Sequence, residues 1–145
     1  MTFGVLAGSA LACVAAGYAI TAALAARKAL PVAAAVSAAA LQPVSVLKPL
    51  CGAEPRLYEN LASLCRQQHP TYQLVFGVRA ADDPAIGVVR RLQADFPACD
   101  IALVVDQRIH GSNLKVSNLM NLLPAAHHSW LVVADSDIAV TPDYL

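Results

Sequence analysis

Two aspartates one residue apart, Asp135 and Asp137, are the side chains whose spacing most directly suggests chemistry. They follow the apolar run 130–134, which has the composition of a buried strand. In open α/β sheets, ligands bind beyond the carboxyl ends of the strands. Two carboxylates placed there offer hard oxygen ligands to a divalent cation, which can in turn hold a diphosphate. The alternative is a turn or a helix cap, because aspartate is common in both.

Four other polar side chains could join such a site. Asp82 and Asp83 come after the segment 72–78, and Lys115 and Asn118 lie near the start of a segment with helical spacing. Lys115 would add positive charge where the helix dipole also favours an anion. The alternatives are that Asp83 caps a helix and that Lys115 and Asn118 lie on a solvated helix face.

The elements that must position these residues alternate between strand and helix patterns. Strands are expected at 44–47, 72–78, 101–105 and 130–134, and helices at 55–68, from Asp83-Pro84 onward, and at 114–123. Pro55 and Pro84 suit first-turn positions, with Asp83 as the N-cap. This order is typical of a parallel sheet covered by helices. Right-handed connections then bring residues 48–54, 79–83, 106–115 and 135–137 to one edge of the sheet.

The first part of the chain has a different composition. No charged residue occurs from Phe3 to Ala26, which is long enough to span a bilayer core of roughly 20 helical residues. A cleaved signal peptide or a buried core helix are the alternatives, but no basic residue precedes the run, and the run is too long for either. We therefore expect a transmembrane anchor at 1–28, a juxtamembrane linker at 29–43 and a domain at 44–145. Arg27 and Lys28 place that domain in the cytoplasm.

Composition excludes some classes of protein. Ten basic and ten acidic residues give no net charge, which argues against a nucleic-acid partner. The four cysteines have no zinc-like spacing, and a cytoplasmic domain would keep those outside the anchor reduced. His127 and His128 have no carboxylate or cysteine at ligand spacing, so we interpret them as loop histidines.

Four blocks, in this order, resemble ceramide glucosyltransferases and, more closely, the bacterial hopanoid biosynthesis-associated glycosyltransferases. The blocks are Val-Leu-Lys-Pro-Leu-Cys-Gly-Ala-Glu-Pro at 46–55, Asp-Asp-Pro-Ala-Ile at 82–86, Gly-Ser-Asn-Leu-Lys-Val-Ser-Asn-Leu at 111–119 and Ala-Asp-Ser-Asp-Ile at 134–138. The resemblance covers residues 44–145 and includes the N-terminal membrane helix.

The resemblance implies the Rossmann-like, donor-binding half of a GT-A glycosyltransferase. Such an enzyme transfers a sugar from a UDP-sugar to a lipid hydroxyl, with inversion, at the cytoplasmic face of a membrane, here the bacterial inner membrane. The implied donor-binding residues are Glu54, Asp82, Asp83, Lys115, Asn118 and Asp135. Asp135 and Asp137, the family's DxD motif, would hold a divalent cation, Mn²⁺ or Mg²⁺.

The family's general base is a later aspartate, followed by a (Gln/Arg)-x-x-Arg-Trp motif. We expect both beyond Leu145, so no catalytic base is predicted within the chain and the 145 residues alone are expected not to complete the transfer. A membrane-tethered nucleotide-binding module without activity is the alternative. A receiver-like domain is disfavoured, because Lys48-Pro49-Leu50 stands where that fold carries an acidic cluster. The acceptor lipid and the transferred sugar stay open.

Overall fold

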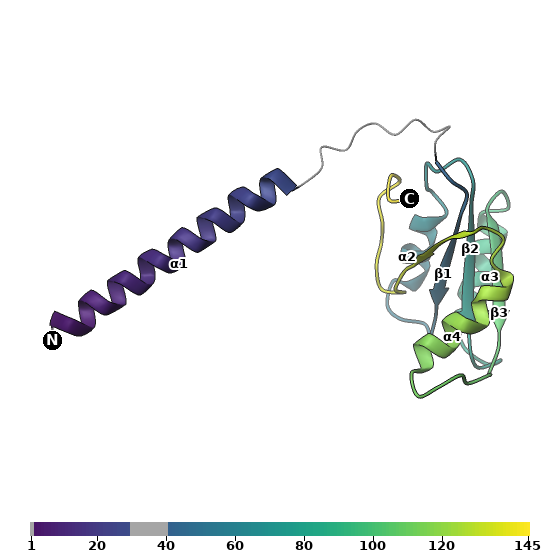
Figure 1. Ribbon diagram of the computed structural model, residues 1–145. Coiled ribbons are helices and arrows are strands. Elements are labelled where there is room, and N and C mark those ends of the chain that lie inside the picture. Colours follow the sequence, from purple (N-terminus) through teal and green to yellow (C-terminus); the bar gives the residue numbers. More distant parts are fainter. Residues whose placement is uncertain (1, 30–40) are drawn as a thin grey trace. The chain divides into compact units, whose positions relative to one another are not determined.

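A computed structural model describes residues 2–29 and 41–145 of the chain (Figure 1). The chain divides into two units, residues 1–36 and 37–145. Most of the expected linker at 29–43 lies outside the described residues, and the predicted domain boundaries stay predictions.

The first unit contains one long helix, α1 (Thr2–Ala29), of 28 residues. Its residues Thr2 to Ala26 carry no charge, and the described apolar side chains, among them Val14, Ile20 and Leu24, are exposed. Among the residues that the structure describes, no helix has the length and apolar character needed to cross a membrane. The helix is therefore present, while its expected role as a transmembrane span is not confirmed.

The second unit is built on a four-stranded, fully parallel sheet with the order β3-β2-β1-β4. The strands are β1 (Val44–Pro49), β2 (Tyr72–Val78), β3 (Asp100–Val105) and β4 (Trp130–Val133). Pairing of β1 with β2 aligns Val44 with Tyr72, and pairing with β4 aligns Val44 with Trp130. The predicted α/β class with a parallel sheet is confirmed, and the carboxyl ends of all four strands lie at one edge.

Helices cover both faces of this sheet. In Figure 1, α2 (Leu57–Leu64) and α3 (Ala85–Asp95) lie behind the sheet, and α4 (Leu114–Leu122) lies in front of it, followed by the short 3₁₀ helix η2 (Leu123–Ala125). The helical spacing of Leu57, Leu61 and Leu64 puts all three in the core between α2, α3 and the sheet. A smaller core lies under α4, formed by Leu47, Val75 and Leu122.

Two helix starts differ from the prediction. Arg56 has a left-handed backbone with φ 64°, so α2 begins at Leu57 and not at Pro55, and it ends at Leu64 instead of Gln68. The helix α3 begins at Ala85 with Pro84 at its N-cap. Asp83 still satisfies a free amide of the first turn, because its Oδ1 accepts a hydrogen bond from Ala85 N at 2.9 Å.

The prediction that 130–134 is a buried strand is wrong. The run 130–134 has the composition of a buried strand. Within residues 41–145, however, β4 lies at the edge of the sheet and pairs with β1 alone. Trp130 is 65% exposed and Val133 is 53% exposed. Apolar composition alone does not distinguish a central strand from an edge strand, because that depends on the pairing of distant segments.

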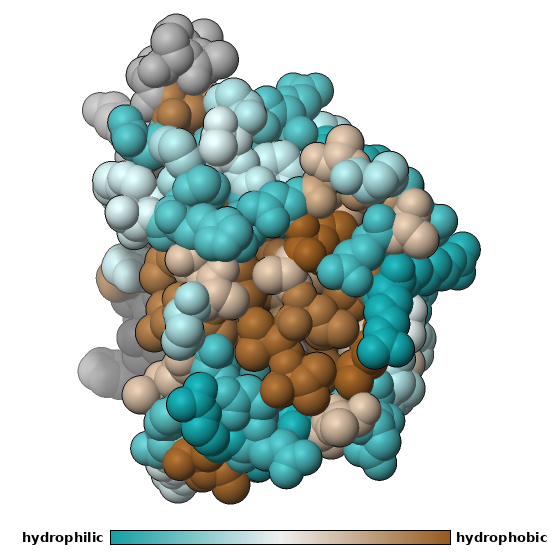
Figure 2. Space-filling model, turned by 90° about the vertical axis from the view of Figure 1, so that its right-hand side faces the viewer, coloured by the Kyte–Doolittle hydropathy of each residue, from teal (hydrophilic) through white to brown (hydrophobic). Residues whose placement is uncertain are grey.

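The helix α4 is also only partly covered. Its residues Leu119 and Leu122 pack toward the sheet, whereas Val116, Met120 and the following Leu123 are exposed. The face of the domain on the right of Figure 1 carries hydrophobic side chains at its centre with hydrophilic ones around them (Figure 2). Apolar surface therefore remains on this side of the described chain.

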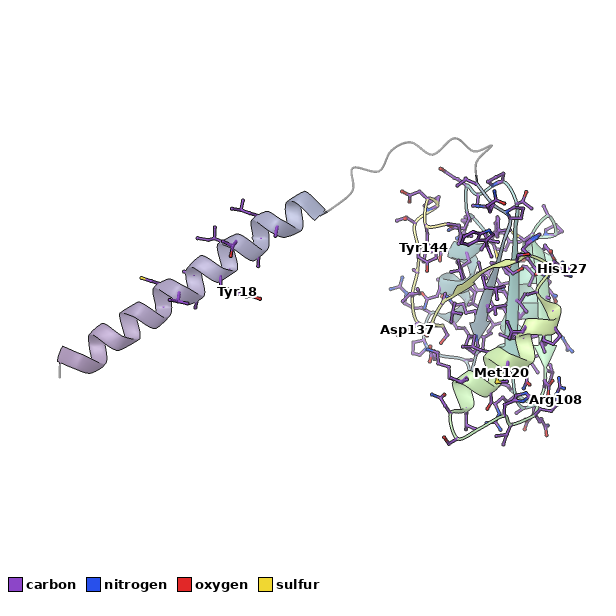
Figure 3. All side chains as sticks on the ribbon, in the orientation of Figure 1. Tyr18, Arg108, Met120, His127, Asp137 and Tyr144 are labelled. Carbon is purple, nitrogen blue, oxygen red and sulfur yellow. The ribbon has the colours of Figure 1, made fainter. Side chains whose placement is uncertain are left out.

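A buried polar network fixes the start of β4. The side-chain oxygen of Gln73 accepts hydrogen bonds from Ser45 Oγ at 2.8 Å and from the backbone amide of His127 at 2.9 Å. Ser45 Oγ in turn accepts from the amide of His128 at 3.1 Å. The two histidines lie in the loop before β4, as predicted. His127 precedes β4 and Asp137 follows it, so they lie on opposite sides of the domain in Figure 3.

The contact between β2 and α4 depends on a glycine. A Cβ on Gly77 would overlap the side chain of Leu122 and lie 2.7 Å from Asn118 Oδ1. Asn118 Nδ2 donates to the carbonyl of Gly77 at 2.9 Å, so the helix sits directly on the strand backbone. The absence of a side chain at position 77 therefore allows α4 to reach the sheet.

We predict opposite effects for the same substitution at two glycines. Gly77→Ala should lower the free energy of unfolding by about 1–3 kcal/mol, because overpacking displaces α4. Gly87→Ala, at an exposed position of α3 with open space around it, should raise the free energy by about 0.5–1 kcal/mol through helix propensity. Urea unfolding of the full chain in detergent, followed by circular dichroism, measures both. A neutral Gly77→Ala would contradict the described packing.

Candidate functional site

A cavity of about 850 Å³ opens at the carboxyl edge of the sheet. Its walls come from the loops after β1, β2 and β4, from the loop before α4, and from α4 itself. Six of the predicted site residues line it, namely Glu54, Asp83, Lys115, Asn118, Asp135 and Asp137. Asp82 does not line the cavity and is exposed.

The segment after β4 carries the two predicted metal ligands and is held on both sides. The Asp135 carboxylate forms an ion pair with the ammonium of Lys115 on α4. Ser136 Oγ donates to Glu54 at 3.1 Å, and the Ser136 carbonyl accepts from Asn60 Nδ2 at 3.3 Å. These contacts join the loop after β1, α2 and α4 around Asp135 and Asp137.

The Asp83 carboxylate accepts its hydrogen bonds from backbone amides. Both its carboxylate oxygens lie 3.1 Å from the amide of Gly52, and one of them also accepts from Ala85 N. Gly52 has φ 72°, a conformation that favours glycine. Asp83 therefore fastens the loop after β1 to the start of α3. These contacts favour the helix-capping alternative for Asp83 over direct ligand binding. The side chain nevertheless forms part of the cavity wall.

One face of α4 is polar and buried, and it organises the loop before the helix. Asn113 caps the helix by accepting from the amides of Lys115 and Val116, both at 3.1 Å. Asn121 Nδ2 donates to the carbonyls of Asp106 and Arg108. Asn118 is likewise buried. The solvated-face alternative is therefore wrong for Asn118, whereas Lys115 is exposed.

Lys48 is a residue of this edge that sequence reasoning did not single out. It is completely buried at the end of β1, and its Nζ has no hydrogen-bond partner in the described residues. Burial lowers the pKa of Lys48 to about 8, and the nearby charges of Asp135 and Asp137 oppose this shift. The sequence signal for a buried lysine is its place within an apolar strand, directly before Pro49. An ordinary exposed lysine at the end of a strand has the same pattern.

Unsatisfied polar atoms concentrate at this edge of the sheet. Among the described residues, three buried side-chain atoms have no hydrogen-bond partner: Lys48 Nζ, Arg79 Nε and Asn118 Oδ1. Arg79 and Asn118 line the cavity, and Lys48 immediately precedes its wall residue Pro49. An unsatisfied buried group costs about 1–3 kcal/mol, so such a cluster is typical of a site that a ligand completes.

Carboxylates alone do not form a complete metal centre here. In the parts of the chain that are described, no group of three or more His, Cys, Asp or Glu side chains is arranged to hold a metal ion. Asp135 and Asp137 contribute oxygen ligands to one wall of the cavity. A cation bound by one or two carboxylates usually completes its coordination with water and substrate phosphates.

Comparison with known sequences gives a consistent family. The sequence model of glycosyl transferase family 21 matches residues 7–145 of the chain. Ceramide glucosyltransferase 1 of Caenorhabditis elegans is 35% identical over 100 residues, which cover 69% of this chain and 22% of the relative. Ceramide glucosyltransferase of Gibberella zeae is 29% identical over 105 residues, with 66% and 20% covered. The chain thus spans about a fifth of the length of these relatives. The predicted resemblance to ceramide glucosyltransferases is confirmed, and the closer likeness to hopanoid-associated enzymes stays a prediction.

Solved structures share the fold. The mannosyltransferase PcManGT from Pyrobaculum calidifontis, in complex with GDP-Man and Mn²⁺, has a TM-score of 0.63 and 22% identity, and the likeness covers 89% of this chain and 38% of that one. S. aureus TarS 1-349 in complex with UDP-GlcNAc has a TM-score of 0.55 and 18% identity, with 69% and 28% covered. At this identity the likeness shows the fold alone, and it confirms the Rossmann-like glycosyltransferase fold predicted for the second unit.

We predict a pH-dependent effect of Lys48→Met on stability. The folded pKa of Lys48, about 8, is below the usual 10.5, so the folded state binds fewer protons between these values. The free energy of unfolding of the natural chain should therefore rise across this window. Below pH 8, Lys48→Met should be more stable by about 1–3 kcal/mol, because it removes an unpaired buried charge. The difference should shrink toward pH 10.5.

Urea unfolding at several pH values tests this, with Leu47→Met as a buried control that cannot titrate. A difference between Lys48→Met and the natural chain that stays constant from pH 7 to 10.5 would show that the Lys48 ammonium is not buried as described.

Proposed function

Because this chain belongs to glycosyl transferase family 21, we propose that it binds the donor in the transfer of a sugar from a UDP-sugar to a lipid hydroxyl. The observation that carries the proposal is the cavity at the carboxyl edge, where Asp135, Asp137 and Lys115 meet. Ligands of α/β sheets bind at this edge, and the cavity volume is in the range of small-molecule sites. The ceramide- or hopanoid-type acceptor belongs to the same proposal.

The donor diphosphate would lie against the segment after β4. A diphosphate and the carboxylates of Asp135 and Asp137 repel each other, so a cation must lie between them. The two carboxylates fit Mn²⁺ or Mg²⁺, which would complete their coordination with phosphate oxygens and water. When bound, such a cation supplies Lewis-acid stabilisation of the charge that develops on the departing UDP. PcManGT, which has this fold, carries Mn²⁺ with its nucleotide sugar.

Lys115 would supply the second positive charge at the diphosphate. Its ammonium is already held at the cavity by Asp135, and the two side chains are about half exposed, at 53% and 58%. The N-terminal end of α4, capped by Asn113, adds the positive end of the helix dipole on the same side. The lysine ammonium can therefore exchange the carboxylate for a phosphate oxygen while it stays in the cavity and partly exposed to solvent.

Inversion at the anomeric carbon requires a general base on the face of the sugar opposite UDP. The chain matches only about a fifth of its relatives. We propose that residues 44–145 supply the donor-binding half of the reaction, and that the base and the acceptor contacts belong to the remainder of such an enzyme. The chain alone would then bind the donor without transferring the sugar.

Membrane anchoring through α1 is part of the same proposal. The helix has no charge from Phe3 to Ala26, and Arg27 and Lys28 follow, which would place the domain on the cytoplasmic side of a bacterial inner membrane. We expect the chain to stay in the membrane pellet after extraction with alkaline carbonate. Complete release into the supernatant would contradict anchoring and leave the donor site unaffected.

We predict that UDP binding depends on a divalent cation and on the two aspartates. The chain in detergent should bind UDP more tightly with Mn²⁺ than without it, and Asp135→Asn or Asp137→Asn should weaken that binding roughly tenfold or more, because a charge-assisted contact is lost. Isothermal titration calorimetry measures this, with circular dichroism to verify folding.

Asp143→Asn is the matched control, because this exposed carboxylate lies on the same terminal segment and does not line the cavity. The control should bind UDP like the natural chain. Equal UDP binding by the folded Asp135 and Asp137 variants would rule out the assigned site.

A further inference from the structure

Arg79 is a cationic side chain in the cavity that the predicted site does not include. It directly follows β2, which ends at Val78, and it lines the same cavity as Lys115 and Asp135. We propose that the Arg79 guanidinium binds an anionic oxygen of the donor diphosphate. The inference rests on the proposed function, since it assigns a residue to the donor pocket defined there.

The first observation is that Arg79 lacks a partner of its own. Its Nε is buried without a hydrogen-bond acceptor, and within residues 41–145 the guanidinium forms no ion pair with a carboxylate. A buried N–H that has lost its water and gained no acceptor is destabilising, unless a ligand supplies the acceptor.

Two other arginines of the domain have partners of their own. Arg108 forms hydrogen bonds to both carboxylate oxygens of Asp106, at 2.6 to 3.1 Å. The guanidinium of Arg91 lies 4.1 Å from the centre of the Tyr58 ring and also pairs with Asp95. Unlike these surface arginines, Arg79 is half-buried and faces a cavity.

The second observation is that most carboxylates of the cavity wall contact groups other than Arg79. Asp83 accepts hydrogen bonds from backbone amides, Glu54 from Ser136, and Asp135 from Lys115. Three of the four carboxylates in the cavity wall thus have described partners other than Arg79. Within residues 41–145, the Arg79 guanidinium is therefore not paired with any carboxylate of the cavity wall.

The chemistry of the side chain selects the ligand group. A guanidinium presents several N–H donors in one plane, which matches two oxygens of a phosphate or carboxylate. The ligand proposed for this cavity carries a diphosphate, and Lys115 is already shared with Asp135. Arg79 is therefore a cation of the cavity wall that is free to contact a phosphate oxygen from the side of β2.

Binding of uridine and UDP to the full chain in detergent with Mn²⁺ tests the inference. We expect Arg79→Gln to weaken UDP binding roughly tenfold or more and to leave uridine binding unchanged, because only UDP carries the diphosphate. Arg79→Lys, which keeps the charge without the planar fork, should fall between the two. Arg90→Gln, at an exposed position of α3, should match the natural chain.

Two results would overturn the role of Arg79 alone: UDP binding by Arg79→Gln equal to that of the natural chain, or an equal loss for uridine and UDP, which would place the guanidinium at the nucleoside. Circular dichroism and the Arg79→Lys variant separate these from misfolding. Failure of the natural chain to bind UDP would instead overturn the proposed function, and the assignment of Arg79 with it.

Discussion

Parallel pairing of β1 with both of its neighbours is the constraint on which the rest of the domain depends. Because β2 and β4 run in the same direction as β1, the loops that follow all three strands emerge at one edge. Segments as distant in the sequence as Glu54 and Ser136 thereby come into hydrogen-bond contact. The buried network around Gln73 at the other end of the strands fixes β4 against β1, and so determines where Asp135 and Asp137 lie.

The middle of the sheet and its carboxyl edge bury different kinds of side chain. The middle of the sheet is filled by side chains such as Leu74 and Phe76, which need no polar partner. At the carboxyl edge the chain instead buries Lys48, and it leaves polar atoms of Arg79 and Asn118 unsatisfied. Domains keep such groups where a ligand supplies the missing contacts, so the edge is less stable in isolation than the core beneath it.

Local pattern was sufficient to predict β2, which has the bounds expected from its apolar run between Pro70 and the polar residues after Val78. It was insufficient at Pro55, because the left-handed backbone of Arg56 delays the start of α2. The exposure of Trp130 and the burial of Lys48 depend on which strands become neighbours, a property of distant pairing that composition does not encode. The place of Asp135 and Asp137 at the carboxyl edge could be predicted, because they directly follow an apolar strand and all strands of a parallel sheet end at that edge. Arg79 is distinguished only by its missing partner.

We propose that a divalent cation and the donor diphosphate meet at Asp135 and Asp137. Paramagnetic broadening of backbone amide signals by Mn²⁺, recorded by NMR on the full chain with saturating UDP, tests the location directly. Broadening should be strongest at residues 135–137 and extend to Lys115 and the loop after β2, and it should require UDP. Broadening centred on His127 and His128, at the other side of the domain, or spread equally over exposed carboxylates with and without UDP, would contradict the account.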